Sequence, residues 1–382
     1  MRYTIVSETY PPEVNGVALT VQGLEHGLRL RGHELEVVRP RQQGDADTVA
    51  RSMLVRGASL PFYSGLRFGL PATRRLREHW RRRRPDAIYV ATEGPLGWSA
   101  LRAARQLGIP AATGFHTRFD HYMRDYGLGF LQGTAMRWMR HFHNMGNATL
   151  VPTRELQALL EHERFDSVLR LARAVDTRMF DPMRRDDDLR ASWGAGKDDV
   201  VLIHVGRIAS EKNLGLAVGA FRELKRQCSG ARFVWVGDGP ERERLQQDNP
   251  DFIFCGIRRA ADLARHFASG DVFVFPSVSE TFGNVTLEAL ASAVPTVAFN
   301  YAAAREHLRN GMHGALVAMG DEQGFINAVV ELGTHVLMRR TMRGNCRHAV
   351  RGLHPAQVIA DFDLILHSLA RGAHVDAPAH GC

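Results

Sequence analysis

Lysine, cysteine and long apolar runs are scarce in this chain, and the last two shortages each exclude a class of protein. The 382 residues include three lysines against 46 arginines, and four cysteines that form neither a Cys-x-x-Cys pair nor the spacing of a metal site. We therefore expect a reducing cytoplasm and no disulfides. No apolar run reaches the length of a membrane span. The opening letters MRYTIVSETYPP indicate a short strand and a turn rather than a signal peptide.

The chain does have an ordinary hydrophobic content and an uneven charge. Hydrophobic residues make up 45% of the sequence, and 382 residues exceed one ordinary core, so we expect two domains. The whole net charge of +8 lies in residues 1–172, which hold 24 arginines and 16 acidic residues. Either that half faces an anionic partner (a phospholipid surface, a nucleic acid or an acidic substrate), or it has a solvated face rich in arginine.

Short apolar runs alternate with helical patterns along both halves. After the first run, Val17, Val21, Leu24 and Leu28 recur at the spacing of an amphipathic helix. Runs that are apolar on both faces and alternate with helices predict parallel sheets covered on both sides. The expected strands are residues 3–7, 34–40, 87–91, 111–115, 148–153, 200–206, 232–237, 252–256, 272–277 and 296–299.

The predicted fold class is α/β, with two doubly wound, Rossmann-like domains and a cleft between them. A polar, glycine-punctuated segment, DPMRRDDDLRASWGAGKDD, indicates the join. The expected divisions are a first domain (1–172), a linker (173–198), a second domain (199–355), a C-terminal helix that could return to the first domain (356–370) and a disordered tail (371–382).

Polar and glycine residues stand where several expected strands end. In open parallel sheets, ligands bind at the carboxyl ends of the strands, so these loops are expected to converge on the cleft. They are Gly16, His116, Gly206 with Arg207, Gly237, and the stretch SETFGNVTLEAL at 279–290.

Arg207 and Lys212 indicate a diphosphate ligand. A forked guanidinium and a compact ammonium five residues apart can grip a diphosphate together. With so few lysines in the chain, Lys212 does not look exchangeable with arginine. A solvated pair at a helix start is the alternative.

Glu280 and Glu288 add hydroxyl-binding groups to this site. If Asn284 caps a helix, the free amides that follow can hold a phosphate. Glu288 stands four residues after Asn284, whereas a capping box needs three. Carboxylates on both sides of a phosphate site suit a ligand with hydroxyls on both sides of a diphosphate, which describes a nucleotide sugar. Two solvated glutamates are the alternative.

These motifs resemble those of glycosyltransferase family 4, whose members are retaining enzymes of the GT-B fold. Glu280 and Glu288 match the family's E-x7-E motif. The resemblance covers almost the whole chain in the family's order, and it is specific to the family rather than to one sugar. The other matches are GRIASEKN (206–213), NGV (15–17), FHTR (115–118) and VGDGP (236–240).

The resemblance implies a role for each matching residue. Glu288 would bind the donor ribose, and Glu280 would bind the hexose hydroxyls. Arg207 and Lys212 would stabilise the leaving diphosphate, and His116 would contact and orient the sugar. The implied catalytic residues are therefore His116, Arg207, Lys212 and Glu280. The implied donor-binding residues are Asn15, Gly16, Val17, Gly206, Arg207, Lys212, Gly237, Ile257, Glu280, Phe282, Gly283, Asn284, Val285 and Glu288.

Some positions extend the resemblance and others depart from it. Gly16 would let the first-domain backbone approach the β-phosphate, and Ile257 lies where the family holds the base. Many relatives carry Asn-Gly-Val-Asp where this chain has Arg-Ala-Val-Asp at 173–176, and Gly-Gly where it has Tyr-Ala-Ala at 301–303. Both departures concern the identity of the donor more than the reaction.

Apart from the nucleotide-diphosphate sugar, which is the donor substrate, no cofactor and no metal is expected. DAD (45–47) and DFD (361–363) have the letters of a metal-binding Asp-x-Asp motif, but neither falls at a cleft loop. DDD (186–188) lies in the expected linker, and Arg207 with Lys212 already supplies the cationic role.

The segment RRLREHWRRRRP (74–85) contains seven arginines and lies close to an aromatic, glycine-rich stretch at 60–71. A basic helix with a tryptophan can lie on an anionic membrane surface, and a solvated helix is the alternative. The expected acceptor or membrane residues are Arg118, Tyr122, Trp80, Arg81, Arg82, Arg83 and Arg84.

The resulting hypothesis is a retaining transfer of a hexose from a UDP- or GDP-linked sugar to an acceptor. The acceptor is a membrane lipid such as diacylglycerol or a phosphoinositide-like lipid, or else a soluble sugar or polysaccharide. An epimerase would need further acid and base residues, and a nucleic-acid binder would leave Glu280 and Glu288 unexplained, so no nucleic-acid partner is expected. The expected location is the cytoplasm, with peripheral attachment to the inner face of the plasma membrane as an option.

Overall fold

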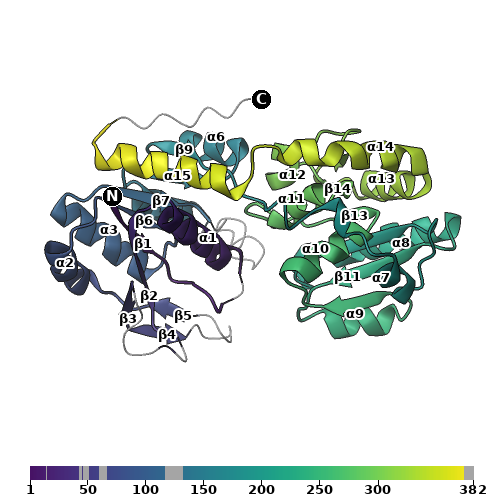
Figure 1. Cartoon of the computed structure of the whole chain (residues 1–382), viewed down its shortest axis with the longest axis horizontal. Helices are drawn as coiled ribbons and strands as arrows, with labels where there is room; N and C mark the ends of the chain where they lie inside the picture. Colours follow the sequence, from purple (N-terminus) through teal and green to yellow (C-terminus); the bar gives the residue numbers. More distant parts are fainter. Residues whose placement is uncertain (14, 43–44, 46–50, 60–66, 117–131, 374–382) are drawn as a thin grey trace. The chain divides into compact units, whose positions relative to one another are not determined.

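The computed structural model describes residues 1–13, 15–42, 45, 51–59, 67–116 and 132–373. The chain divides into two units, the first formed by Met1–Arg173 with Pro355–Cys382, and the second by Ala174–His354. In Figure 1 the first unit has purple and blue elements together with the yellow C-terminal helix, and the second is teal to green. Each unit contains one parallel sheet with helices on both faces, which confirms the predicted α/β class.

Seven strands form the sheet of the first unit in the order β3-β2-β1-β6-β7-β8-β9, and every neighbouring pair is parallel. A separate antiparallel pair joins β4 (Gly57–Ser59) to β5 (Arg67–Gly69). The seven strands are β1 (Arg2–Val6), β2 (Glu34–Pro40), β3 (Ser52–Val55), β6 (Ala87–Val90), β7 (Ala111–Gly114), β8 (Ala148–Val151) and β9 (Val168–Arg170). The helices are α1 (Gly16–Leu30), α2 (Thr73–Arg82), α3 (Pro95–Leu107), α5 (Gln132–His143), α6 (Arg154–His162) and α15 (Pro355–Ala370).

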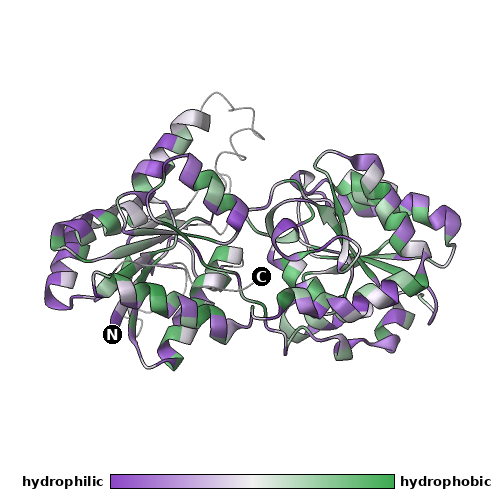
Figure 2. Ribbon diagram, turned by 90° about the horizontal axis from the view of Figure 1, so that it is seen from above, coloured by the Kyte–Doolittle hydropathy of each residue, from purple (hydrophilic) through white to green (hydrophobic). Residues whose placement is uncertain are grey.

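Both faces of this sheet are buried. Successive side chains of a strand point to opposite faces, and those of β1 enter core clusters on both sides. Tyr3 and Ile5 of β1 belong to a core cluster with residues of α1 and α15. Val6, at the end of the same strand, belongs to a second cluster with Trp80 of α2 and Leu96 of α3. The strands accordingly appear mostly green in Figure 2, while the helices carry purple residues as well.

The last helix, α15, belongs to the first unit although it follows the second in sequence. It contacts α1 and β6. A Cβ added at Gly27 of α1 would lie 2.0 Å from Cδ1 of Ile359, so the absence of a side chain allows the two helices to pack closely. Asp363 of α15 pairs with Arg31 at 2.7 Å and with His33 at 2.9 Å.

Six parallel strands form the sheet of the second unit in the order β12-β11-β10-β13-β14-β15. They are β10 (Val201–Val205), β11 (Arg232–Val236), β12 (Ile253–Gly256), β13 (Val272–Phe275), β14 (Thr296–Phe299) and β15 (Gly314–Val317). The α-helices are α7 (Asp187–Ser192), α8 (Leu214–Gln227), α9 (Arg242–Asp248), α10 (Ala260–Ser269), α11 (Asn284–Ala291), α12 (Ala302–His307), α13 (Glu322–Thr334) and α14 (Val336–Cys346). Short 3₁₀ helices are η2 (Pro182–Arg184), η3 (Ser210–Lys212) and η4 (Arg347–Val350).

The segment 173–198 is not a linker, and that expectation was wrong. Apart from Arg173 it belongs to the second unit, where η2 and α7 contact α10. Phe180 and Trp193 are buried in the core, and buried Arg190 forms an ion pair with Asp271 at 2.9 Å. The polar letters that suggested a linker include two helix caps, Asp181 and Asp186, and the buried charge of Arg190.

Candidate active site

Two glycines bring the ends of β10 and β11 together at the carboxyl edge of the second sheet. Gly206 and Gly237 have φ values of 154° and 140°, which other residues rarely adopt. A Cβ at Gly237 would lie 1.9 Å from the carbonyl oxygen of Gly206, so the chains can meet only without a side chain there. The edge at which the sequence predicts a ligand therefore has no side chains at these two positions, so a ligand can approach the backbone there.

Lys212 and Glu280 lie side by side at this edge. Lys212 ends η3, and its Nζ donates to Oε1 of Glu280 at 2.5 Å. Ser277 donates to the same oxygen at 2.9 Å. The two charged side chains are 15% and 17% exposed, so solvent screens their interaction little. The structure thus joins two of the predicted site residues, 68 positions apart in the sequence, into one ion pair.

Tyr301 holds the loop that carries Glu280. Its hydroxyl accepts from the backbone amide of Glu280 at 3.0 Å and donates to the carbonyl of Ser277 at 2.8 Å. Tyr301 begins the Tyr-Ala-Ala sequence that departs from the family's Gly-Gly pattern. The sequence marked this position as unusual but gave no sign of its contact with the Glu280 loop.

Arg207 is not held as Lys212 is. Its side chain is 58% exposed, and it reaches Glu211 at 3.4 Å. This contact is long for a hydrogen bond and lies at the surface, so it fixes the guanidinium weakly. The Arg207 side chain can therefore turn toward a ligand, whereas the Lys212 side chain is already fixed by its ion pair with Glu280.

Glu288 lies on α11 with an unsatisfied carboxylate oxygen. Burial raises the pKa of Glu288 to about 7. Its Oε2 is buried and has no hydrogen-bond partner in the described part of the chain. Such an atom costs free energy unless a ligand donates to it. A ribose hydroxyl is a donor of the right kind.

The start of α11 differs from the expectation. Gly283, with a φ of 87°, is the N-cap, and Asn284 is the first helical residue, so the hypothesis that Asn284 caps the helix was wrong. Glycine takes this left-handed conformation at little cost. Phe282 is buried in the core and Val285 is partly buried, so both anchor the turn.

Ile257 follows β12 and is an exposed large apolar side chain at the same edge of the sheet. A nucleobase offers a flat apolar face, which such a residue can cover. Arg242 pairs with Asp238 at 3.3 Å, and its Nη1 would lie 3.8 Å from a Cβ at Gly256, the residue before Ile257.

In the first unit, the predicted loop 15–17 begins α1. Asn15 is the N-cap, and its side chain accepts from the amide of Ala18 at 2.8 Å. Gly16 is the first residue of α1, and Val17 packs partly against the core. The Asn15 side chain therefore acts locally as a cap.

His116 follows β7 and has protein partners on both ring nitrogens. Arg173 donates from Nη2 to Nδ1, and Nε2 lies 2.8 Å from the hydroxyl of Tyr89. Because a guanidinium only donates, Nδ1 must be the acceptor and Nε2 must carry the proton. Burial and the charge of Arg173 lower the pKa of His116 well below its usual value, so the ring is neutral. Sequence reasoning missed Arg173 as a site residue, although it had noted the departure at 173–176.

The residues expected at a membrane differ in burial and in their contacts. Trp80 is fully buried in the core, so the expectation that it lies on a membrane was wrong. Arg83 pairs with Glu34, and Arg84 donates to two backbone carbonyls. Arg81 and Arg82 are exposed. Arg118 and Tyr122 lie outside the described residues.

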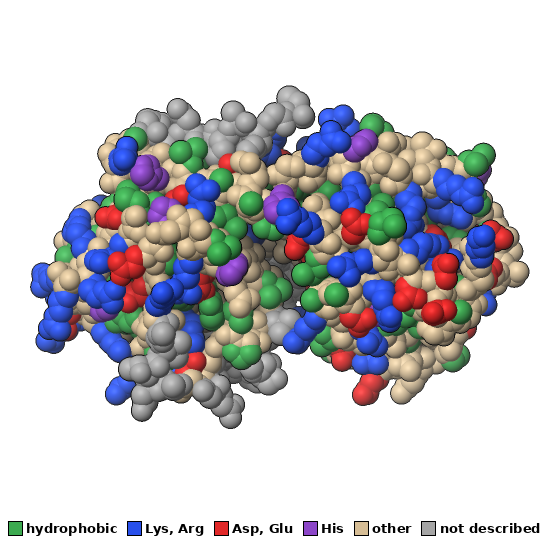
Figure 3. Space-filling model, viewed as in Figure 1, with side chains coloured by type: hydrophobic (Ala, Val, Ile, Leu, Met, Phe, Trp, Pro, Cys, Tyr) green, Lys and Arg blue, Asp and Glu red, His purple; other side chains and the backbone are tan. Residues whose placement is uncertain are grey.

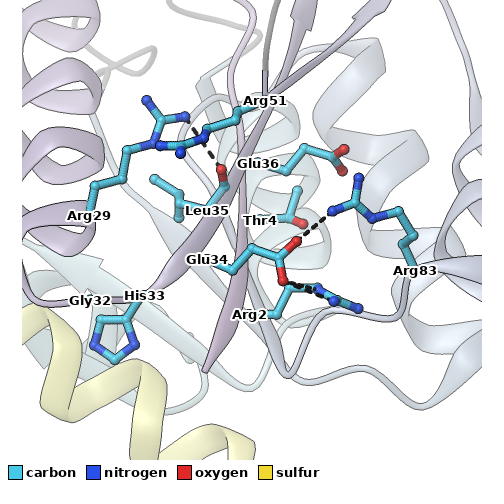
Figure 4. A pocket seen from close by; sticks show the side chains of 10 residues that line it. All are labelled: Arg2, Thr4, Arg29, Gly32, His33, Glu34, Leu35, Glu36, Arg51 and Arg83. Carbon is cyan, nitrogen blue, oxygen red and sulfur yellow. Dashed lines mark hydrogen bonds and ion pairs between the residues drawn. The ribbon is translucent and has the colours of Figure 1, made fainter.

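A cavity of about 560 Å³ lies at the opposite, amino edge of the first sheet. Figure 4 shows Arg2 and Arg83 both bonded to Glu34 within it. Of the predicted site residues, only Arg83 lines it. Ligands of open parallel sheets bind at the carboxyl edge, so we place the candidate active site there and not in this cavity.

The described residues bring together no group of three or more His, Cys, Asp or Glu side chains that could hold a metal ion. Within the same ranges, none of the helices has both the length and the apolarity needed to cross a bilayer.

Comparison with known proteins decides the family. Residues 14–179 match the model of Glycosyltransferase Family 4, and residues 199–335 match Glycosyl transferases group 1. A GDP-mannose-dependent alpha-mannosyltransferase of Mycolicibacterium smegmatis is 35% identical over 90% of this chain and 91% of its own. The chain belongs to glycosyltransferase family 4. The predicted resemblance is thereby confirmed.

Other relatives of this glycosyltransferase act with different sugars. Sulfoquinovosyl transferase SQD2 of Arabidopsis thaliana is 31% identical over 75% of this chain and 56% of its own.

Two solved structures have the same fold at 17% identity. Sucrose-phosphate synthase of Thermosynechococcus elongatus has a TM-score of 0.78, covering 97% of this chain and 100% of its own. Anabaena HepE, in complex with UDP and glucose, has a TM-score of 0.74, covering 96% and 99%. The GT-B fold is thereby confirmed.

Proposed function

We propose that this glycosyltransferase moves mannose from GDP-mannose to a membrane-lipid acceptor and retains the anomeric configuration. Three relatives, 33–35% identical over 87–90% of the chain, are named GDP-mannose-dependent alpha-mannosyltransferases. The names of others contain a lipid, among them an alpha-monoglucosyldiacylglycerol synthase and a phosphatidylinositol dimannoside mannosyltransferase. These names support a lipid acceptor and favour mannose over glucose.

The observation that carries the proposal is the pairing of Lys212 with Glu280 beside the bare glycine edge. Lys212 supplies a fixed positive charge at the place where a diphosphate leaves. Arg207, weakly held, adds a second charge that can close on the phosphates. Glu280 then offers its second oxygen to the hexose hydroxyls, since Oε1 already accepts from Lys212 and Ser277.

Glu288 completes the donor site through the ribose. Its unsatisfied oxygen accepts a hydrogen bond from a ribose hydroxyl. This bond offsets the free-energy cost of burying the oxygen. The exposed side chain of Ile257 covers the base. His116, neutral and fixed by Arg173 and Tyr89, contributes a ring of defined orientation on the first unit.

The donor is tested by thermal shift and by transfer from labelled sugars. GDP and GDP-mannose should raise the melting temperature, because a ligand that binds only the folded state stabilises it. UDP and UDP-glucose should raise it less. Labelled mannose should appear in a lipid extract when membranes are supplied. A larger shift and faster transfer with UDP-glucose would replace mannose by glucose in the proposal.

We also propose that turnover needs no metal ion. Arg207 and Lys212 supply the positive charge that a divalent cation would otherwise bring to the diphosphate. Turnover in excess EDTA should equal turnover in buffer alone. A loss that added Mg²⁺ or Mn²⁺ restores would show that the enzyme uses a metal. The location that follows from a lipid acceptor is the inner face of the plasma membrane, with the protein attached peripherally.

A further inference from the structure

Arg173 links two parts of the first unit that the sequence assigned to the site. Its Nη1 donates to the hydroxyl of Thr20 on α1 at 2.9 Å, and its Nη2 donates to Nδ1 of His116. Thr20 in turn donates to the carbonyl of Gly16 at 2.7 Å. The start of α1 and the loop after β7 are therefore held together by one guanidinium.

Neither partner of Arg173 neutralises its charge. The Thr20 hydroxyl is uncharged, and His116 accepts at Nδ1 as the neutral ring. Among the described residues, no carboxylate forms an ion pair with Arg173. The buried arginines Arg39 and Arg190 are different, since Arg39 pairs with Asp45 at 2.7 Å and Arg190 with Asp271.

A partly buried charge that has no counter-ion among the described residues is costly. Burial lowers the pKa of the Arg173 guanidinium, and the charge of Arg173 helps lower the pKa of His116. Proteins seldom keep such a charge out of water unless an anion joins it. Thr20 and His116 take two of the five N–H groups of the guanidinium, so others remain for a ligand.

The place of this charge indicates which ligand it meets. Arg173 follows β9 and His116 follows β7, so both stand at the carboxyl edge of the first sheet, where ligands of such sheets bind. The diphosphate of the donor already has Arg207 and Lys212 in the second unit. Since Arg173 has no counter-ion in the described part of the chain, its charge is available for the other substrate.

We propose that Arg173 is an anion-binding residue and that it binds a carboxylate or phosphate on the head group of the acceptor. The inference rests on the proposed glycosyl transfer and adds to it the chemical class of the acceptor. A planar guanidinium can hold either anion through two parallel hydrogen bonds. A neutral head group would leave its charge unpaired.

The test compares acceptors that differ in one charged group. A hexuronosyl-diacylglycerol and the matching hexosyl-diacylglycerol differ by a carboxylate in place of a hydroxymethyl group, and phosphatidylinositol supplies the phosphate case. All are presented in neutral detergent micelles, with labelled GDP-mannose as the donor. The wild type should favour a charged acceptor over the neutral one by about tenfold or more in kcat/KM.

Three variants separate the charge from the local structure. Arg173→Gln should lower kcat/KM for the charged acceptor by roughly ten- to a hundredfold. It should lower transfer to the neutral acceptor and hydrolysis of GDP-mannose by a smaller factor, because these reactions lose only the contact that fixes His116. Arg173→Lys should keep part of the preference, because it keeps the charge without the fork. Thr20→Val, the control, removes one neutral partner and should preserve the preference.

Two outcomes would overturn the inference. If Arg173→Gln lowers transfer to both acceptors equally, Arg173 only positions His116 and α1. If it lowers the affinity for GDP in calorimetry instead, its anion is the donor diphosphate. Should Arg173→Gln fail to fold, a folded Arg173→Lys decides. A reduced charge preference supports the two-bond contact of the guanidinium, and an unchanged preference rejects it.

Failure of the proposed function would look different. A wild type that neither transfers nor hydrolyses GDP-mannose contradicts the proposed mannosyl transfer. In that case titration with free glucuronate and with inositol 1-phosphate still tests the site. Weaker binding of either anion to Arg173→Gln than to the wild type would support anion binding, and equal binding of both would reject it.

Discussion

At the scale of single residues, Lys212 pairs with Glu280, and the proposed donor site adds the phosphates as its second partner. We expect Glu280→Gln to fold normally and to lose turnover by roughly tenfold to a thousandfold, because one charged hydrogen bond is lost. The amide oxygen can still accept from Lys212, so the loop should keep its shape. Steady-state transfer assays and circular dichroism would show this. Glu223→Gln, on the surface of α8, is the matched control, and equal rates for both variants would remove Glu280 from the site.

Glu288 makes a prediction about pH. Burial raises its pKa from 4.5 to about 7 in the folded protein. Between those values the folded state holds a proton that the unfolded state has released, so the free energy of unfolding falls as the pH rises. The loss should be on the order of 1–3 kcal/mol between pH 4.5 and 7. Melting temperatures of the wild type and Glu288→Gln at pH 5 and pH 7.5 measure it.

In this comparison Glu288→Gln is the control as well as the variant. It has no carboxyl proton to lose, so its melting temperature should fall less than that of the wild type over the same pH range. Parallel curves for the two proteins would mean that Glu288 is solvated and has an ordinary pKa. Adding GDP at pH 7.5 should narrow the difference, because a ribose hydroxyl stabilises the ionised carboxylate.

The sequence indicated the loops of the candidate site better than the contacts within them. Strand ends and spacing placed Arg207, Lys212 and Glu280 at one edge. Nothing in the letters revealed that Lys212 and Glu280 pair, since this depends on how two loops 68 residues apart meet. Arg173 was visible as a departure from a pattern. Its charge became informative only when the structure showed its neutral partners.

At the scale of elements, two glycines of α1 offer a matched test of the packing between α1 and α15. Gly23→Ala adds a methyl group with no atom within 4 Å, whereas Gly27→Ala drives it into Ile359. The first should stabilise by up to about 1 kcal/mol through helix propensity. The second should destabilise by about 1–3 kcal/mol through overpacking. Denaturant titration of both variants measures the sign of each change in the free energy of unfolding. Stabilisation by Gly27→Ala would mean that α15 moves aside freely.

Strands that appear in the sequence as clear apolar runs could be predicted, and strands without such a run could not. The apolar runs at 87–91 and 232–237 became β6 and β11. The strand β9 has three residues and β15 begins at Gly314, so neither gives a recognisable run. Trp80 was misplaced for a related reason. The arginines around it hide the one buried face of α2, which consists of Leu76 and Trp80.

At the scale of the whole molecule, the excess charge of residues 1–172 is partly used inside the fold. Arg31 holds Asp363 of α15, and Arg39 is paired with Asp45. Other arginines remain at the surface, and blue side chains gather over α2 on the face shown in Figure 3. Because Trp80 is buried, attachment of this face to a membrane would have to be electrostatic. Such attachment weakens as salt is added.

Arg81 and Arg82 are the residues on which we expect that attachment to depend. Both are exposed, and neither forms an ion pair with a described residue, whereas Arg83 and Arg84 have partners. Each basic residue near an anionic surface contributes about 1 kcal/mol, so Arg81→Gln with Arg82→Gln should weaken vesicle binding roughly thirtyfold.

The control is Arg226→Gln with Arg244→Gln, which removes the same charge from exposed side chains of the second unit. Sedimentation with vesicles rich in anionic phospholipid, at low and at high salt, distinguishes the two pairs. Equal binding by both pairs would mean that α2 does not face the membrane, and a wild type that ignores the vesicles would favour a soluble acceptor.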